Sequence, residues 1–155
     1  MIPYGRQNIL QSDIDEVLKV LKSDFLTQGP KVPLFESLVS KKVGAKHAVA
    51  VNSATSALHI ACLALGLGKN DILWTVPNSF VASSNCGLYC GAKIDFVDIE
   101  YSTGNIDVNL LEDKLKNSKQ KPRVLIPVHF AGQPTEQERI LKLSKKYGFK
   151  IIEDA

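Results

Sequence analysis

The chain has 155 residues, of which 45% are hydrophobic and 23% are charged, and its formal net charge is +3. These values are typical of a globular protein with one sizeable core. Its lysines form no basic stripe interleaved with aromatic residues, which argues against nucleic-acid binding. No apolar stretch approaches the ~20 residues needed to span a membrane, and the N-terminal MIPYGRQNIL lacks the pattern of a signal peptide. The sequence therefore predicts a cytoplasmic protein without a membrane or nucleic-acid partner.

The first 45 residues are predicted to form a helical segment. In QSDIDEVLKVLKSD, Ser12 is the expected N-cap, with Asp15 three residues later. Apolar residues then follow at helical spacing: Ile14, Val17, Leu18 and Leu21. A loop, FLTQGPKVP, separates this helix from a second one, LFESLVSKKVG, which Gly44 ends.

Residues 46–155 show a regular alternation of strands and helices. The predicted strands are HAVAVN (47–52), DILWTVP (71–77), KIDFVDI (93–99), PRVLIPVHF (122–130) and FKIIEDA (149–155). The predicted helices between them cover residues 56–65, 79–91, 107–117 and 135–148. Strands that read as continuous apolar runs, joined through helices by short connections, are typical of a parallel sheet covered on both faces. We therefore predict an α/β protein with a parallel-rich α/β/α sheet.

The three cysteines, Cys62, Cys86 and Cys90, have neither the number nor the spacing of a disulfide framework or a zinc site. Cys86 and Cys90 are four residues apart and fall on one face of a predicted helix. Small buried thiols in a reducing compartment are the expected role. We predict no metal site.

The residues at the ends of the predicted strands, or directly after them, are the candidates for a functional site, because ligands of open α/β sheets bind at the carboxyl ends of the strands. These residues are Asn52 to Ser56, Pro77 to Phe80, Asp98, His129 to Gly132, and Glu153 with Asp154.

The junction NSATS, residues 52–56, has two interpretations. A helix N-terminus exposes backbone N–H groups and a partial positive charge, which can hold a phosphate without any lysine. The small side chain of Ala54 and the hydroxyl of Thr55 suit such a site. Simple N-capping by Ser53 or Thr55 is the alternative. Neither GxGxxG nor GxxxxGK[ST] is present, which argues against dinucleotide and P-loop chemistry.

Three other residues at strand ends have similar double interpretations. Asp154 either caps a following helix or pairs with a lysine, or it holds a protonated heterocyclic nitrogen such as the pyridinium of pyridoxal phosphate. Phe80 is either a core residue or a flat surface for a ring. His129 is a weaker candidate, since a histidine at a strand end is often simply hydrogen-bonded in place. A phosphate site, a stacking ring and a pyridinium partner together would form one cofactor site.

Six segments of the chain resemble, in the same order, a known family: NSATSALHIA, TVPNSFVASSN, GAKIDFVDI, GNID, VHFAGQP and IIEDA. This is the DegT/DnrJ/EryC1/StrS family of sugar-nucleotide aminotransferases, which use pyridoxal 5'-phosphate and have the aspartate-aminotransferase fold. The resemblance covers nearly the whole chain. It implies that residues 46–155 are part of the large domain of a pyridoxal-phosphate-dependent transferase of fold type I.

Carried over to matching positions, the resemblance assigns five residues to the cofactor: Ala54, Thr55, Phe80, His129 and Asp154. The backbone at residues 54 and 55 and the Thr55 hydroxyl would bind the phosphate. Phe80 would lie against the pyridine ring and Asp154 on its nitrogen, where it would act as the catalytic carboxylate. His129 would lie near the cofactor.

The resemblance also implies a substrate. LTQGPKV, SFVASSN and TGNID are most similar to the transaminases of pseudaminic acid synthesis, which aminate C4 of a UDP-linked 4-keto-6-deoxy-N-acetylhexosamine with glutamate as the amino donor. Thr27 and Gly29, in the N-terminal loop, would help to shape the sugar-nucleotide end of the site. The family's active sites lie at a homodimer interface, so a homodimer is the expected assembly.

The chain departs from the family in length. Members are more than twice as long, and their Schiff-base lysine lies in a serine-rich segment downstream of the EDA motif. No lysine of the 155 residues lies in such a segment. We therefore expect the sequence to be the N-terminal part of an enzyme, inactive and poorly stable alone, in which the strand at residues 47–52 has no neighbour. A stand-alone module for a phosphorylated ligand and a family member without transaminase activity remain alternatives.

Overall fold

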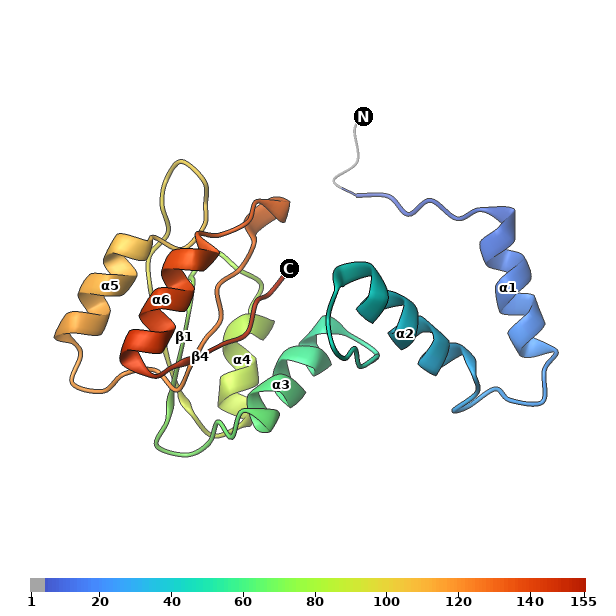
Figure 1. Ribbon diagram of the computed structural model, residues 1–155, viewed down its shortest axis with the longest axis horizontal. Helices are drawn as coiled ribbons and strands as arrows, with labels where there is room; N and C mark the ends of the chain where they lie inside the picture. The colour runs from blue at the N-terminus through green and yellow to red at the C-terminus, as the bar shows by residue number, and fades with distance from the viewer. Residues whose placement is uncertain (1–4) are drawn as a thin grey trace. The chain divides into compact units, whose positions relative to one another are not determined.

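The computed structural model describes residues 5–155, which divide into two compact units (Figure 1). One ends at Ala50 and the other comprises Val51–Ala155. Within the described residues, no helix combines the length and the apolar character that crossing a membrane requires.

The first unit contains two helices, α1 (Gln11–Leu21) and α2 (Lys31–Val43). The expected cap at Ser12 is wrong: the helix begins earlier because the Asp13 carboxylate accepts the N–H of Leu10 at 2.8 Å. The second helix begins three residues before the expected start, since Pro33 lies in its first turn, where a missing N–H costs nothing. It ends, as expected, at Gly44, whose φ of 68° is left-handed.

The second unit contains the predicted alternation of helices and strands. Its helices are α3 (Ala54–Ala64), α4 (Ala82–Tyr89), α5 (Val108–Asn117) and α6 (Gln137–Tyr147), with a short 3-10 turn, η1 (Phe130–Gly132). Its strands are β1 (Ile72–Thr75), β2 (Lys93–Phe96), β3 (Val124–Leu125) and β4 (Lys150–Ile151). Each is shorter than the apolar run that predicted it.

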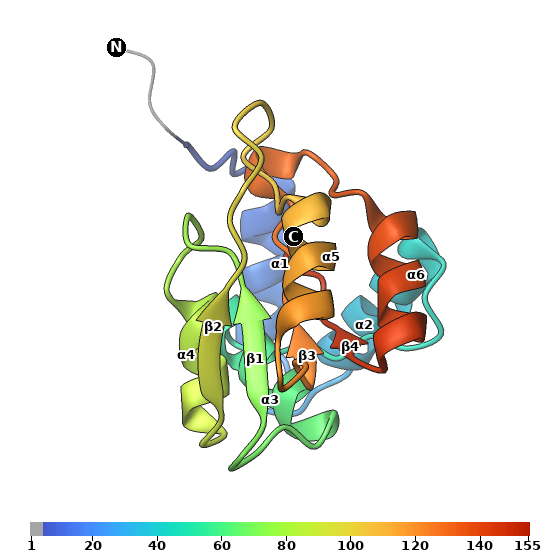
Figure 2. The ribbon, with the colours of Figure 1, turned by 90° about the vertical axis from the view of Figure 1, so that its left-hand side faces the viewer.

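The four strands form one parallel sheet in the order β2-β1-β3-β4 (Figure 2). Beyond the last regular pairing, an isolated parallel bridge joins Val128 to Asp154. Since all strands run in one direction, their carboxyl ends meet at a single edge of the sheet. The predicted parallel α/β fold is therefore confirmed.

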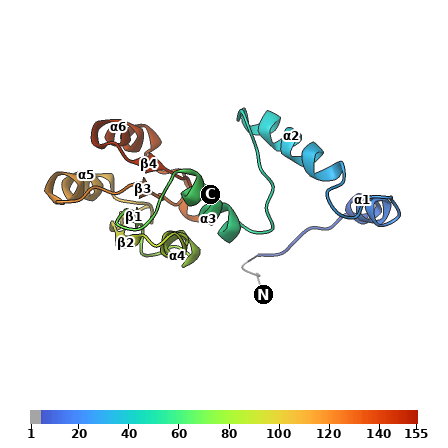
Figure 3. The ribbon, with the colours of Figure 1, turned by 90° about the horizontal axis from the view of Figure 1, so that it is seen from below.

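Side chains alternate between two cores along the central strands β1 and β3. Leu73 packs with α3 and α4, whereas the next residue, Trp74, packs with α5 and α6. Val124 and Leu125 on β3 divide in the same way. Period-two alternation with both faces buried requires a helical layer on each side, and Figure 3 shows α5 and α6 on one side of the strands and α4 on the other.

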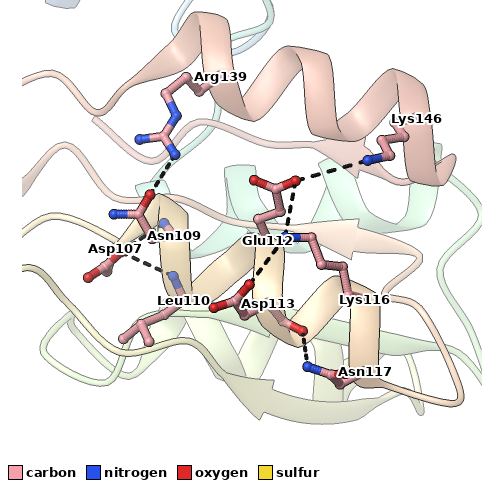
Figure 4. Close-up of polar contacts among 9 residues, drawn as sticks. All are labelled: Asp107, Asn109, Leu110, Glu112, Asp113, Lys116, Asn117, Arg139 and Lys146. Carbon is pink, nitrogen blue, oxygen red and sulfur yellow. Dashed lines mark hydrogen bonds and ion pairs between the residues drawn. The ribbon is translucent and has the colours of Figure 1, made fainter.

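The outer surface of the α5–α6 layer carries polar contacts (Figure 4). Asp107 caps α5 by accepting the N–H groups of Asn109 and Leu110 at 2.8 and 3.1 Å. Between the two helices, Arg139 donates to Asn109 at 2.8 Å, and Lys146 lies 4.0 Å from Glu112. This layer therefore has an ordinary solvated face.

Residues 47–52 do not form the predicted strand. They make no strand pairing, and the side chain of Val49 is 74% exposed. The apolar sequence alone is not sufficient, because a strand exists only where a neighbour accepts its backbone hydrogen bonds. No described strand lies beside this segment, which is the situation expected from the resemblance.

Candidate functional site

The start of α3 presents unpaired backbone donors. Ser53 is the N-cap, and its Oγ accepts the N–H of Ser56 at 3.2 Å. Among the described residues, the N–H groups of Ala54 and Thr55 and the Thr55 hydroxyl have no hydrogen-bond partner. Of the two residues expected as possible caps, Ser53 is therefore the N-cap, and Thr55 has no capping hydrogen bond among the described residues. Two adjacent N–H groups at a helix N-terminus, beside a small side chain, suit an anion.

Asp154 is fixed at the carboxyl edge of the sheet by its backbone and by one carboxylate oxygen. Its N–H donates to Pro127 at 3.1 Å, and its carbonyl accepts the N–H of His129 at 2.9 Å. The hydroxyl of Ser83, in the first turn of α4, donates to Oδ2 at 2.6 Å. The other oxygen, Oδ1, has no partner among the described residues. One carboxylate oxygen of Asp154 is thus fixed by the Ser83 hydroxyl, and the other can accept a hydrogen bond from a ligand.

Phe80 precedes α4 and follows β1, and its side chain is 75% exposed. The core alternative is therefore wrong for this structure, because a core phenylalanine is buried. Its position three residues before Ser83 places it at the same edge of the sheet as Asp154. The hydrogen bonds of Asp154 to Ser83 and His129 thus bring Phe80, His129 and Asp154 to one edge of the sheet, and α3 packs against α4 next to Phe80's connection.

The imidazole of His129 is held in one tautomer. Its Nδ1 accepts the N–H of Thr135 at 3.1 Å, so the ring proton is assigned to Nε2, which donates to Glu153 at 3.2 Å. Gln137 donates to the same carboxylate oxygen at 2.9 Å. The side chain of His129 is 10% exposed. The expectation of a histidine hydrogen-bonded in place is therefore met, and the ring is neutral in this arrangement.

The segment after His129 depends on the GNID motif, residues 104–107. Asn105 is buried; its Nδ2 donates to the carbonyls of Gln133 and Pro134 at 3.0 and 3.1 Å, and its Oδ1 accepts the N–H of Phe130 at 3.0 Å. Gly104 has a φ of 72°, and a Cβ there would lie 2.8 Å from the Phe130 ring. The motif therefore shapes the loop that positions His129, a role that the sequence did not reveal.

Thr27 and Gly29 lie in the first unit, in the loop between α1 and α2. A Cβ on Gly29 would meet Phe25 Cβ at 3.0 Å and the Phe25 carbonyl at 3.1 Å, so the close approach requires glycine. The intervening Gln28 has a left-handed φ of 52°. Thr27 and Gly29 belong to the first unit, whereas the other five residues belong to the second.

The cysteines behave largely as expected. Cys62 and Cys86 are fully buried, with their sulfurs 3.7 Å apart, and Cys90 is partly buried; all three are free thiols. The hydrogen bond to Cys86 and burial raise the pKa of the Cys62 thiol, which keeps it protonated. In residues 5–155 no cluster of three or more metal-ligating side chains occurs.

Ser83 and Ser79 were missed by the sequence analysis as site residues. The Oγ atoms of Ser79 and Ser83 lie 2.8 Å apart, next to the Ser83–Asp154 hydrogen bond. The available signal was their four-residue spacing in a helix of small residues that follows a strand end. Small polar residues of this kind are also common at any helix start, so the spacing alone is not decisive.

The donor set of this edge fits a phosphorylated pyridine cofactor. Unpaired N–H groups and the Thr55 hydroxyl suit a phosphate, an exposed phenylalanine suits an aromatic ring, and the available oxygen of Asp154 suits a protonated ring nitrogen. These groups come from α3, from the β1–α4 connection and from the segment that follows β4. No single element of the fold contains them all.

Comparison with known proteins gives an independent result. The model of the DegT/DnrJ/EryC1/StrS aminotransferase family matches residues 7–155. A UDP-4-amino-4,6-dideoxy-N-acetyl-beta-L-altrosamine transaminase of Campylobacter jejuni is 45% identical over 155 residues, which are 100% of this chain and 41% of that protein. The chain therefore spans about two fifths of the length of this curated relative.

Two solved structures are similar to this structure over 99% of the chain. Helicobacter pylori PseC, described as an aminotransferase involved in the biosynthesis of pseudoaminic acid, has a TM-score of 0.91 at 35% identity, with 41% of that chain covered. The putative sugar aminotransferase Spr1654 of Streptococcus pneumoniae, in its PLP-form, has a TM-score of 0.90 at 28% identity, with 42% covered. Pyridoxal phosphate is thus the cofactor found in structures of this kind. On the match over residues 7–155, the chain belongs to the DegT/DnrJ/EryC1/StrS aminotransferase family.

Proposed function

We propose that this chain is the cofactor-binding part of a pyridoxal-phosphate-dependent aminotransferase. Its substrate would be a UDP-linked 4-keto-6-deoxy-N-acetylhexosamine, aminated at C4 with glutamate as the donor. The observation that carries the proposal is Asp154, whose Oδ2 is held by Ser83 at 2.6 Å while Oδ1 is available. Three features of the chain correspond to three parts of the cofactor: this carboxylate to the ring nitrogen, the exposed Phe80 to the ring face, and the free N–H groups at the start of α3 to the phosphate.

When bound, pyridoxal phosphate supplies an electron sink through its protonated ring nitrogen. Asp154 would hold the proton at that nitrogen, because a carboxylate stabilises the adjacent cation. Phe80 would support one face of the ring. The N–H groups of Ala54 and Thr55, with the Thr55 hydroxyl, would bind the phosphate. His129, neutral and held by Thr135, would border the cofactor without adding charge.

The substrate assignment is supported by the names of relatives. The Campylobacter jejuni relative is named as a transaminase of a UDP-linked amino sugar, and PseC is described as acting in pseudoaminic acid biosynthesis. A further relative, the spore coat polysaccharide biosynthesis protein SpsC of Bacillus subtilis, is 40% identical over 154 residues. We infer a role in surface or flagellar glycan biosynthesis in the cytoplasm, in a homodimer, with Thr27 and Gly29 at the sugar-nucleotide end.

The 155 residues alone are proposed to be inactive, since the family resemblance places the Schiff-base lysine downstream of the EDA motif. The test is therefore made with the whole protein. It is incubated with the UDP-linked 4-keto sugar and glutamate, and the 2-oxoglutarate formed is measured. We expect turnover that requires both substrates and added pyridoxal phosphate. Absence of 2-oxoglutarate, in a folded protein loaded with cofactor, would contradict the assignment.

The unpaired N–H groups at the start of α3 favour a second candidate function. They would bind many phosphorylated ligands, so a module that binds such a ligand without chemistry remains the alternative. In the same experiment, this alternative predicts cofactor binding without formation of 2-oxoglutarate.

A further inference from the structure

We propose that Ser83 is a positioning residue for the cofactor and acts through Asp154. This inference rests on the proposed function. In this role Ser83 does not touch the cofactor; it holds Oδ2 of Asp154, so that Oδ1 is kept in place for the ring nitrogen.

The backbone around Asp154 leaves only its side chain free to move. The parallel bridge to Val128, with hydrogen bonds to Pro127 and from His129, fixes the position of the Asp154 Cα. The carboxylate can still rotate about its side-chain torsions, for which several rotamers are available. The 2.6 Å hydrogen bond from Ser83 selects one of them. Ser83 thus controls the remaining freedom of the group.

Ser83 is itself held firmly. Its side chain is buried, with 1% of the residue exposed, and it lies on α4, which packs against β1 and β2. A hydroxyl has one proton, which Ser83 gives to Asp154. In the 2.8 Å contact between Ser79 and Ser83, Ser79 is therefore the donor, and its proton takes this contact in preference to the longer one, 3.4 Å, to the Phe80 carbonyl. The hydrogen bonds run in one direction, from Ser79 to Ser83 to Asp154.

The direction of these hydrogen bonds suits a negatively charged carboxylate. A hydroxyl that accepts one hydrogen bond becomes a better donor for the next, and a charged acceptor makes the final bond strong. A serine with a purely structural role could donate the same hydrogen bond to a partly buried carboxylate. The two roles differ in one respect: only a positioning residue changes the affinity for a ligand that needs Asp154.

The experiment measures binding of pyridoxamine phosphate to the whole protein by calorimetry, since this form of the cofactor binds without a covalent bond to a lysine. Four variants are compared: Ser83→Ala, Asp154→Ala, the double variant, and Ser84→Ala. Ser84 is a matched control on the same helix, because its hydroxyl donates to the Val81 carbonyl and not to Asp154. A second probe is the analogue of pyridoxamine phosphate with carbon in place of the ring nitrogen.

We expect Ser83→Ala to weaken binding of pyridoxamine phosphate by about tenfold, the scale of one hydrogen bond to a charged group. Ser84→Ala should bind as the wild type does. The double variant should bind no more weakly than Asp154→Ala alone, because Ser83 has nothing to act on once the carboxylate is gone. The carbon analogue should bind equally to the wild type and to Ser83→Ala.

The inference would be overturned if Ser83→Ala bound pyridoxamine phosphate as tightly as the wild type does. It would also be overturned if the serine substitution weakened binding as much in the Asp154→Ala background as in the wild type. The inference would likewise be overturned if Ser83→Ala weakened binding of the carbon analogue as much as binding of pyridoxamine phosphate. If Ser83→Ala does not fold, Ser83→Cys replaces it in the same comparison, since a thiol has similar size but is a weak donor. The proposed function fails separately: it is contradicted if the wild type does not bind pyridoxamine phosphate or if Asp154→Ala binds it normally.

Discussion

The hydroxyl of Ser83 lies 2.6 Å from a carboxylate oxygen of Asp154, although the two residues are 71 positions apart in the chain. The contact joins the first turn of α4, which follows β1, to the segment that follows β4. These strands are not neighbours in the sheet, because β3 lies between them. The hydrogen bond therefore spans the carboxyl edge at the point where the proposed cofactor site lies.

Replacement of Asp154 by alanine tests the proposed role of its carboxylate. In the whole protein, we expect transamination to fall by several orders of magnitude, on the order of 4 kcal/mol or more, because a preorganised charge beside the ring nitrogen is lost. Cofactor affinity should fall less. The measurement is the rate of 2-oxoglutarate formation at saturating cofactor.

The control for this variant is Asp98→Ala. Asp98 is also an aspartate at the end of a predicted strand, but it is exposed, and among the described residues its carboxylate accepts only the N–H of Ile99. It should retain the wild-type rate. If Asp154→Ala kept more than about a tenth of that rate, a loss below ~1.4 kcal/mol, the assigned role would be wrong.

Thr55→Val tests the phosphate site at the start of α3. The variant removes a donor from the anion but leaves the cap, since Ser53 provides it. Affinity for pyridoxal phosphate should fall by about 1.5–3 kcal/mol, ten- to more than a hundredfold, with little change in melting temperature. Ala54→Asp should also repel the phosphate, whereas a carboxylate at a plain helix start is neutral or stabilising.

Ser53→Ala provides the opposite pattern as a control. It should cost roughly 1 kcal/mol of stability through the lost cap and change cofactor affinity far less than Thr55→Val does. Cofactor titrations and melting curves without cofactor separate the two effects. Unchanged affinity in both Thr55→Val and Ala54→Asp would show that residues 52–56 are an ordinary cap.

Asn105→Ala tests the loop that follows His129. The variant removes three hydrogen bonds, to Gln133, Pro134 and Phe130, from a buried site. We expect a loss of roughly 2–4 kcal/mol in the free energy of unfolding, measured by urea denaturation of the whole protein. Asn109→Ala is the matched control, because that side chain accepts a single hydrogen bond from Arg139 on the helix surface. Equal effects of the two substitutions would refute this account of the GNID motif.

The cysteines provide a chemical test of burial. Cys62 and Cys86 have no exposed surface, so neither sulfur can be reached by a reagent in the folded protein. The hydrogen bond to Cys86, together with burial, raises the pKa of the Cys62 thiol, and the same hydrogen bond lowers the pKa of Cys86. In the native protein at neutral pH, iodoacetamide should therefore leave both unmodified, and denaturant should expose them. Mass spectrometry of alkylated peptides measures the result. Rapid native alkylation of Cys62 would contradict the packing of α3 against α4.

Much of the fold was predictable because local signals agree with the tertiary structure. The apolar run around Trp74 and the cap at Asp107 each specify an element without reference to distant residues. The prediction of a strand at residues 47–52 was wrong. A strand forms only beside a second strand that pairs with it, and the apolar run alone does not show whether such a partner is present. The start of α1 was misplaced because Asp13, not Ser12, satisfies the first free N–H.

The site was predictable only in part. Asp154 and Phe80 follow apolar runs, so their position at the carboxyl edge could be inferred from the sequence. Their relation to each other depends on Ser83, whose partner is 71 residues away and leaves no trace in local sequence. Asn105 was missed for the same reason, since its partners lie 25 to 29 residues later.

The most direct test of the central claim is a crystal structure of the whole protein with pyridoxamine phosphate. The account predicts the ring nitrogen within hydrogen-bond distance of Asp154, about 2.6–3.2 Å, with the phosphate against the N–H groups of Ala54 and Thr55 and one ring face on Phe80. A phosphate bound elsewhere, or a ring nitrogen without contact to Asp154, would contradict it.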